Sequence, residues 1–165
     1  MKKLLLLTVV CFTLLHCEAK KNSEITIDTD SAIVLGHKEI IYSEVLNEDR
    51  EVWIHMPASY YDTLYTKTKY PVLYLLDGPE HFYAVSGMIK QLSNANGNSV
   101  VPEMIIVAIS NTDRSRDLTP TPVTMDFFSG DSIQYASGGG AKFLDFMETE
   151  LIPHIDNTYP AAPYR

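Results

Sequence analysis

The chain has 165 residues, of which 45% are hydrophobic and 21% are charged. This length and composition suit one folded domain and exclude a disordered chain. Acidic residues number 21 against 13 basic ones, and the resulting net charge of −8 argues against nucleic acid as a partner and against electrostatic binding to anionic lipid.

The N-terminus has the pattern of an export signal. Two lysines, Lys2 and Lys3, precede an uncharged apolar run that ends at Leu15, and a polar stretch starts at Glu18. A membrane span needs about 20 apolar residues, so a shorter run behind a basic flank is typical of a secretory signal. We predict a signal over residues 1–17 and an exported bacterial protein, held in the cell envelope or released to the periplasm or the outside.

Two cleavage sites fit this leader. The sequence "LLHC" resembles a bacterial lipobox, in which Cys17 would be lipidated and become the new N-terminus; the alternative is ordinary cleavage after Ala19. We favour lipidation of Cys17, because it lies where the apolar run ends and a polar tether follows. Cleavage there leaves 11 basic and 21 acidic residues, so the lipid is the only membrane contact that we expect.

Both cysteines, Cys11 and Cys17, lie in the leader. The exported domain is therefore expected to contain no disulfide and no cysteine-based metal site. The histidines and acidic residues do not have the spacing of metal ligands. We predict neither a metal nor a cofactor.

The first folded elements follow a linker over residues 18–36. Residues 38–57 hold two β-rich segments, "KEIIYSEVL" and "REVWIHMP", separated by an Asn/Asp turn. Apolar Val52, Ile54 and Met56 alternate with more polar neighbours, which predicts an antiparallel β-hairpin.

Two uninterrupted apolar runs come next, "PVLYLLDG" and "MIIVAIS". Such runs are typical of strands buried on both faces. Between them, apolar residues recur at helical spacing over residues 80–93. The order strand, helix, strand predicts a βαβ unit with parallel strands.

A long segment over residues 111–140 separates this unit from a second amphipathic helix. Loops of this length are usually functional or disordered. The helix carries Phe143, Leu144, Met147, Leu151 and Ile155 at helical spacing, and Pro153 is expected to kink or end it. We assign residues 37–165 to one incomplete α/β domain.

Three motifs carry a family resemblance, in the order "YPVLYLLDGPEHF", "VAISNTDRSRDLTPT" and "GGGAKFLDFMETELIPHIDNTY". Together they resemble the esterase branch of the α/β-hydrolase superfamily, which includes enterochelin esterases, feruloyl esterases, esterase D and the mycobacterial mycolyltransferases. The resemblance runs from Lys38 to Arg165. It implies the N-terminal part of an α/β-hydrolase fold, with a β-hairpin, a βαβ unit and a further helix, truncated before the nucleophile-elbow strand.

The resemblance also implies a serine nucleophile in a Gly-x-Ser-x-Gly turn, followed along the chain by an acid and a histidine. Ser86, Ser110 and Ser137 each lack a glycine two residues before them. We therefore expect the triad downstream of Arg165 and no esterase activity from these residues alone. Without the elbow strand, the "PVLYLL" strand would have an unpaired edge, which predicts poor solubility for residues 18–165.

The other half of an esterase site is present in the sequence. By resemblance, the loop "DGPEHF" supplies a backbone N–H to the oxyanion hole, with Gly78, Pro79, Glu80 and His81 as candidates. In the mycolyltransferases the donor directly follows "LLDG", and here that residue is Pro79, which has no N–H. Either Glu80 donates instead, or the loop is reorganised, or the hole is defective.

Two roles are open for several nearby side chains. Asp77 either accepts backbone N–H bonds that orient the oxyanion loop or forms a simple Asp-Gly turn. Arg114, Arg116 and Asp117 either bind a substrate carboxylate or anchor the long loop by an internal ion pair, which we favour. His81 is expected to be a partly buried imidazole that holds the oxyanion loop.

These observations predict the N-terminal portion of an exported serine esterase that acts on a small-molecule ester. One alternative is a non-catalytic surface lipoprotein that binds a ligand through residues 111–140. Another is an acyltransferase that uses the same machinery with an alcohol as acceptor.

Overall fold

The computed structural model describes residues 32–64, 69–133 and 135–163. The export signal, the cleavage sites, Cys17 and most of the linker lie outside the described residues. The chain divides into two units, Met1–Ile33 and Val34–Arg165, and the following description concerns the second. No helix in the described part is both long and apolar enough to cross a bilayer.

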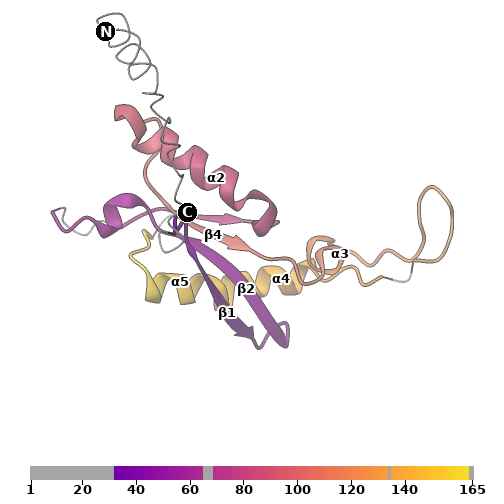
Figure 1. Ribbon diagram of the computed structural model, residues 1–165. Coiled ribbons are helices and arrows are strands. Elements are labelled where there is room, and N and C mark those ends of the chain that lie inside the picture. Colours follow the sequence, from indigo (N-terminus) through magenta and orange to yellow (C-terminus); the bar gives the residue numbers. More distant parts are fainter. Residues whose placement is uncertain (1–31, 65–68, 134, 164–165) are drawn as a thin grey trace, which may run out of the picture. The chain divides into compact units, whose positions relative to one another are not determined.

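The core of the fold is a four-stranded mixed sheet with the order β1-β2-β4-β3 (Figure 1). β1 pairs with β2 as an antiparallel hairpin, β2 pairs antiparallel with β4, and β4 pairs parallel with β3. The strands are β1 (His37–Ser43), β2 (Glu48–His55), β3 (Val72–Leu75) and β4 (Ile105–Ile109). The predicted hairpin and the parallel βαβ unit are both confirmed.

The hydrophobic patterns of the strands explain their places in the sheet. In β2, alternate residues are buried, with Val52 and Ile54 fully so. β4 is buried at all five positions. Its alternate residues belong to two different apolar clusters, one on each face of the sheet, which is why its sequence is apolar throughout.

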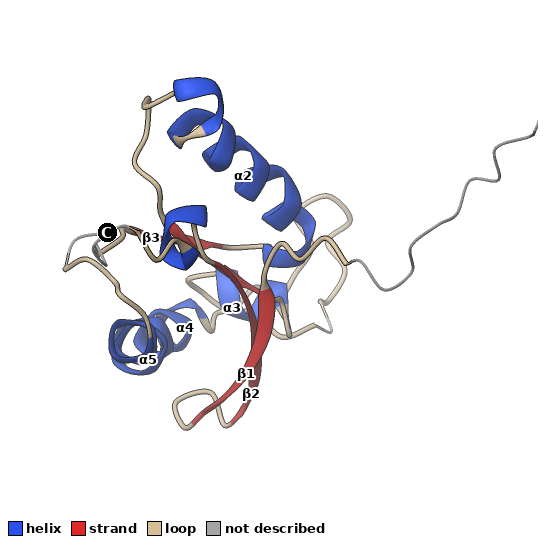
Figure 2. Cartoon of the chain, turned by 60° about the vertical axis from the view of Figure 1, so that its left-hand side comes forward, coloured by secondary structure: helices blue, strands red, loops and turns tan. Residues whose placement is uncertain are grey.

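Helices cover both faces of the sheet (Figure 2). On one side, α2 (Gly78–Ser93) packs Phe82 against Ile106 and Ala108 of β4. On the other side lies a helical run made of α4 (Gly140–Phe146), a π-helical stretch, η3 (Met147–Leu151), and α5 (Ile152–Thr158). The apolar side chains of this helical run pack with the inner side chains of the sheet in the larger apolar cluster. Those from the helical run are Phe143, Phe146, Leu151 and Ile155.

Pro153 does not end this helical run. It occupies one of the first two positions of α5, directly after the π-helical stretch, and the backbone at the junction stays helical. A π turn shifts the hydrogen-bond register to i→i−5. Proline lacks a backbone N–H, and it is tolerated where a helical segment starts because no N–H is required to donate there. The helix therefore changes register instead of stopping.

β3 forms the open edge of the described sheet. At its entrance, the Tyr70 N–H donates to the Pro160 carbonyl (2.8 Å), and the Ala162 N–H donates to the Tyr70 carbonyl (2.7 Å). This single parallel bridge joins Tyr70 and Ala161. Among the described residues, no strand pairs with the outer edge of Val72–Leu75, while the poor solubility expected of such an edge stays a prediction.

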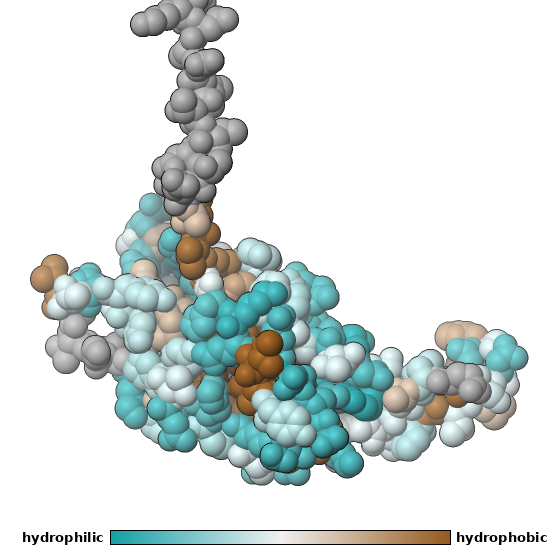
Figure 3. Space-filling model, turned by 60° about the horizontal axis from the view of Figure 1, so that its bottom comes forward, coloured by the Kyte–Doolittle hydropathy of each residue, from teal (hydrophilic) through white to brown (hydrophobic). Residues whose placement is uncertain are grey.

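The long segment after β4 contains one short helix, α3 (Arg114–Leu118). Beyond α3 the chain extends away from the sheet (Figure 1) and is mostly exposed from Pro120 to Ser132. Phe127 and Phe128, which are 93% and 94% exposed, pack edge-to-face on each other. The face of the molecule in Figure 3 is otherwise mostly hydrophilic, with apolar colour confined to small areas.

Candidate functional site

The oxyanion-loop candidates lie at the carboxyl ends of β3 and β4. These strands are parallel, so the turn after Leu75 and the loop after Ile109 leave the sheet at the same edge. In open α/β sheets, ligands bind outside this edge. The two connections that meet here are the β3–α2 turn, residues 76–77, which leads into the first turn of α2, and the β4–α3 loop, residues 110–113.

The β3–α2 turn has an unusual backbone. Asp77 has φ 50° and ψ 46°, the left-handed region that Asp and Asn tolerate better than most residues. Gly78, next to it, lies directly against β4: a Cβ there would come within 2.7 Å of the Ala108 carbonyl carbon and the Ile109 nitrogen. The tight turn therefore requires glycine at position 78, and it brings the start of α2 onto the end of β4.

The carboxylate of Asp77 binds side chains of the β4–α3 loop and of α3. Arg114 donates from Nε to Oδ1 (2.8 Å) and from Nη2 to Oδ2 (3.1 Å), and Asn111 donates from Nδ2 to Oδ1 (2.7 Å). The hydrogen bonds from Arg114 and then Asn111 hold the pKa of Asp77 below its usual value. The sequence left open whether this carboxylate accepts backbone N–H bonds or belongs to a simple Asp-Gly turn, whereas its hydrogen bonds in the structure come from side chains of a segment that the sheet brings alongside.

Asp77 occupies the N-cap position of α2, yet its side chain makes no capping hydrogen bond. The first N–H groups of a helix have no acceptor within the helix, and an N-cap carboxylate normally accepts one of them. Pro79 has no N–H, so the N–H groups of the first three residues of α2 that lack an acceptor within the helix are those of Gly78 and Glu80. They are the groups that could bind an oxyanion.

His81 differs from its expected placement. It was predicted to be partly buried, but its side chain is exposed on the first turn of α2. The buried positions of this helix are Gly78, Phe82 and Ser86, which follow each other at helical spacing and leave position 81 on the outer side.

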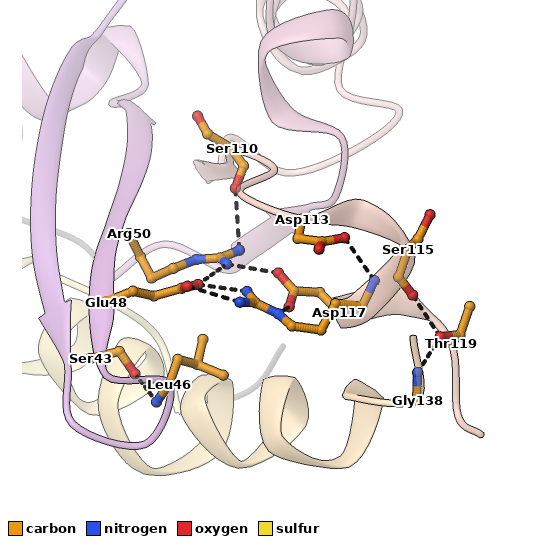
Figure 4. A network of polar contacts seen from close by, with 11 residues as sticks. Ser43, Leu46, Glu48, Arg50, Ser110, Asp113, Ser115, Asp117, Thr119 and Gly138 are labelled. Atoms are coloured by element: carbon orange, nitrogen blue, oxygen red, sulfur yellow. Dashed lines mark hydrogen bonds and ion pairs between the residues drawn. The ribbon is translucent and has the colours of Figure 1, made fainter. Parts of the chain in front are cut away.

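A second cluster of charges lies inside the fold, beneath α3 (Figure 4). Arg50 of β2 is only 1% exposed, and its Nη1 donates to Asp117 Oδ2 (2.7 Å) and to Glu48 Oε1 (2.8 Å). Arg116 donates to both oxygens of Glu48 (2.9 and 2.6 Å) and from Nε to Asp117 Oδ1 (2.7 Å). Two arginines and two carboxylates thus neutralise each other; we call these four residues the buried network.

The buried network ties α3 to the sheet and to the helical layer. The Arg50 guanidinium lies 5.4 Å from the ring centre of Phe143 and 5.7 Å from that of Phe146. Hydrogen bonds from Arg116 hold the pKa of Glu48 below its usual value, although desolvation opposes them. The pKa of Arg116 is raised by the same bonds to Glu48 and by those to Asp117. Asp117 thus lies in the core, 3% exposed.

Three hydrogen bonds, donated by the backbone N–H groups of consecutive glycines, close the long segment onto α3. The Gly139 N–H donates to the Arg116 carbonyl (2.8 Å), the Gly140 N–H to the Thr119 carbonyl (3.0 Å), and the Gly138 N–H to the Thr119 hydroxyl (2.7 Å). Both ends of the 111–140 segment therefore meet at α3. The helix presents Arg114 to the β3–α2 turn, and Arg116 and Asp117 to β2.

The described serines that were considered as nucleophiles have no histidine partner among the contacts of the described residues. Ser86 is buried within α2, the Ser110 hydroxyl donates to Glu51 (3.2 Å), and the Ser137 hydroxyl accepts the Val123 N–H (2.9 Å). His55 and His154 bond elsewhere, to the Leu35 carbonyl (2.6 Å) and to Glu39 (2.9 Å). Within the described residues, no group of three potential metal ligands occurs.

Sequence reasoning missed Glu48, Arg50 and Asn111. For Arg50 a signal existed, because it shares the alternation of Val52 and Ile54 and therefore points to the buried face of β2. A charged residue at an inward position needs a buried partner. No comparable signal marks Asn111, whose partner lies 34 residues away.

A family model described as "Putative esterase" matches residues 43–165. The chain belongs to this esterase family. Among solved structures, an IroE-like serine hydrolase from Shewanella oneidensis is 36% identical, with a TM-score of 0.68, over 76% of this chain and 39% of that one. No curated protein sequence matched.

Two more distant structures share the fold. The BES protein from Bacillus cereus is 21% identical with a TM-score of 0.67, over 82% of this chain and 53% of that one. The enterobactin esterase FES from Shigella flexneri is 21% identical with a TM-score of 0.54, over 80% and 29%. The predicted fold class and family resemblance are confirmed, and the chain spans only 29–53% of the length of these three proteins.

Proposed function

We propose that this chain forms the N-terminal part of an exported serine esterase that hydrolyses a small carboxylic ester. The observation that supports this most directly is the start of α2, where the Gly78 and Glu80 N–H groups lie at the carboxyl edge of β3 and β4 with no capping carboxylate. Membership of the esterase family supports the same chemistry.

In this proposal, a serine outside residues 1–165 attacks the ester carbonyl carbon, and its proton passes to a histidine that also lies outside them. The carbonyl oxygen becomes an oxyanion, which the Glu80 N–H stabilises together with the N–H of the residue after the nucleophile. The alcohol leaves with the proton held by the histidine. Water then attacks the acyl-serine and releases the acid.

Pro79 narrows the choice of donor in this loop. A proline at this position cannot donate, so Glu80, one residue further into α2, takes the role. Removing a single oxyanion donor typically lowers the rate by roughly 100- to 1000-fold, so an esterase with Pro79 needs such a substitute.

Labelling with a fluorophosphonate probe tests the proposal. The 165-residue chain and the product extended through the DNA that follows the Arg165 codon are labelled side by side, and the labelled serine is mapped by mass spectrometry. We expect labelling of the extended product at a serine beyond residue 165, together with hydrolysis of p-nitrophenyl acetate. Labelling of Ser86, Ser110 or Ser137, or no labelling in either protein, would overturn it.

We further propose export with lipidation at Cys17. Metabolic labelling with an alkyne fatty acid, followed by Cys17→Ser, tests this directly. Label should enter the membrane fraction with the native protein and be absent from the variant. An unlabelled protein that starts at Lys20 would instead establish ordinary cleavage after Ala19.

A second candidate function is ligand binding by the arm that follows α3. The exposed pair Phe127 and Phe128 favours this, because two almost fully exposed phenylalanines are uncommon on a protein surface that binds nothing. A stable 165-residue protein that stays unlabelled by the probe and loses a ligand upon Phe127→Ser and Phe128→Ser substitution would support binding over catalysis.

A further inference from the structure

The ion pair between Asp77 and Arg114 lies directly before α2, where the direction of the Asp77 side chain affects the first turn of the helix. Arg114 is 64% exposed, and exposed ion pairs contribute little to global stability. What sets this pair apart is its position: it holds the carboxylate of a residue that is both left-handed and the N-cap of a helix.

The direction of the carboxylate is the informative feature. An aspartate at an N-cap normally has an extended backbone, turns its side chain to the helix and accepts the N–H of the second or third helical residue, whereas the backbone of Asp77 is left-handed. For Asp77 those positions are Pro79, which has no N–H, and Glu80. Arg114 and Asn111 instead engage both carboxylate oxygens through three hydrogen bonds, and the Glu80 N–H receives nothing from Asp77.

We propose that Arg114 and Asn111 are positioning residues: they hold the Asp77 carboxylate away from α2 and so keep the Glu80 N–H open for the substrate oxyanion. The inference rests on the proposed esterase function for its catalytic consequence. Its structural part is supported by the described contacts: Arg114 and Asn111, which we call the clamp, bind the Asp77 carboxylate, and Asp77 does not cap α2.

The buried network gives the clamp a firm base. Arg114 and Arg116 belong to the same five-residue helix, and Arg116 is held by Glu48 and Asp117. The N-terminus of this helix is also capped, since the Asp113 side chain accepts the Arg116 N–H (2.9 Å). Arg114 therefore projects from an anchored helix toward the β3–α2 turn.

Removing Arg114 should release residue 77 from its left-handed conformation to the extended one that a capping residue adopts, and so let the carboxylate turn to the helix. In Arg114→Gln, we expect Asp77 to accept the Glu80 N–H and compete with the substrate oxygen. The rate constant kcat should fall by about 10- to 100-fold, with KM nearly unchanged. This decrease is no larger than the one that follows the removal of a whole oxyanion donor. Amide hydrogen exchange at Glu80 should slow by about fivefold, the protection that an N-cap bond provides.

The decisive test is a second substitution that a purely structural role would not predict. Glycine tolerates the left-handed conformation and has no carboxylate, so Asp77→Gly in the Arg114→Gln background should restore fast exchange at Glu80 and recover most of kcat. If Arg114 merely stabilised the loop, the double variant would be no better than Arg114→Gln. Non-additivity of this kind identifies directly coupled residues.

The experiment uses the product extended beyond the Arg165 codon, with exchange at Glu80 measured by NMR or by fragmentation mass spectrometry. Lys38→Gln is the matched control, because Lys38 forms another exposed ion pair, with Glu51, away from this edge; it should change neither quantity. Unchanged exchange at Glu80 in Arg114→Gln would overturn the clamp. If no variant hydrolyses an ester, the proposed function fails, while the exchange result still decides the clamp.

Discussion

Two clusters of charge sit on opposite sides of α3, and they differ mainly in burial. The buried network joins β2 to α3, with Arg50 and Asp117 at 1% and 3% exposure. The clamp joins α3 to the β3–α2 turn, with Arg114 at 64% and Asp77 at 23%. The same pairing of arginine with carboxylate should therefore matter in two ways: in the core its loss leaves a buried charge without a partner, and at the surface it orients the carboxylate of Asp77.

The largest expected effect is on the buried network. Asp117→Leu leaves Arg50 and Arg116 with one carboxylate between them in a desolvated site, and breaking a buried pair in this way costs about 3–5 kcal/mol. Urea denaturation measures the loss. Lys38→Gln, which removes one partner of an exposed pair, should leave the urea midpoint nearly unchanged. A loss for Asp117→Leu of under about 1 kcal/mol would mean that the network is no more important than a surface pair.

The next effect concerns the tight turn beside the clamp. Gly78→Ala places a methyl group 2.7 Å from backbone atoms of Ala108 and Ile109, which should destabilise the fold by about 1–3 kcal/mol and displace the start of α2. Gly87→Ala is the matched control: it lies in the same helix with no atom within 4 Å of the added Cβ. There alanine should stabilise by about 0.5–1 kcal/mol. Equal effects at the two positions would contradict the close approach at Gly78.

Acid should weaken the buried network. Arg116 holds the folded-state pKa of Glu48 below the ordinary value of 4.5. A depressed pKa contributes stability that is present above the unfolded-state pKa and is lost as pH falls through the folded-state pKa. The urea midpoint should therefore drop as the pH falls below about 4.5, and Glu48→Gln should flatten that drop. An unchanged acid profile in the variant would assign the drop to other carboxylates.

The smallest expected change is in the global stability of Arg114→Gln. Its guanidinium lies in solvent, so the urea midpoint should stay within experimental error of the native value, even though kcat and the exchange at Glu80 change. A large fall in the midpoint would place Arg114 with the buried network and remove the distinction between the two clusters.

The sequence alone allowed the elements to be predicted because their signals are local. Alternation over residues 52–56 indicated the hairpin, two apolar runs indicated buried strands, and helical spacing placed α2 to within two residues of its start at Gly78. Pro153 was the exception among these signals, because the π-helical register before it could not be inferred from the residue type alone.

Tertiary structure decided which charges meet. Asp117 and Arg50 are 67 residues apart, and Arg114 and Asp77 are 37 apart, distances over which no local pattern specifies a partner. The sheet order puts β4 between β2 and β3. The segment that leaves the end of β4 therefore lies between the start of β2 and the end of β3, where α3 can reach Arg50 and Glu48 on one side and Asp77 on the other.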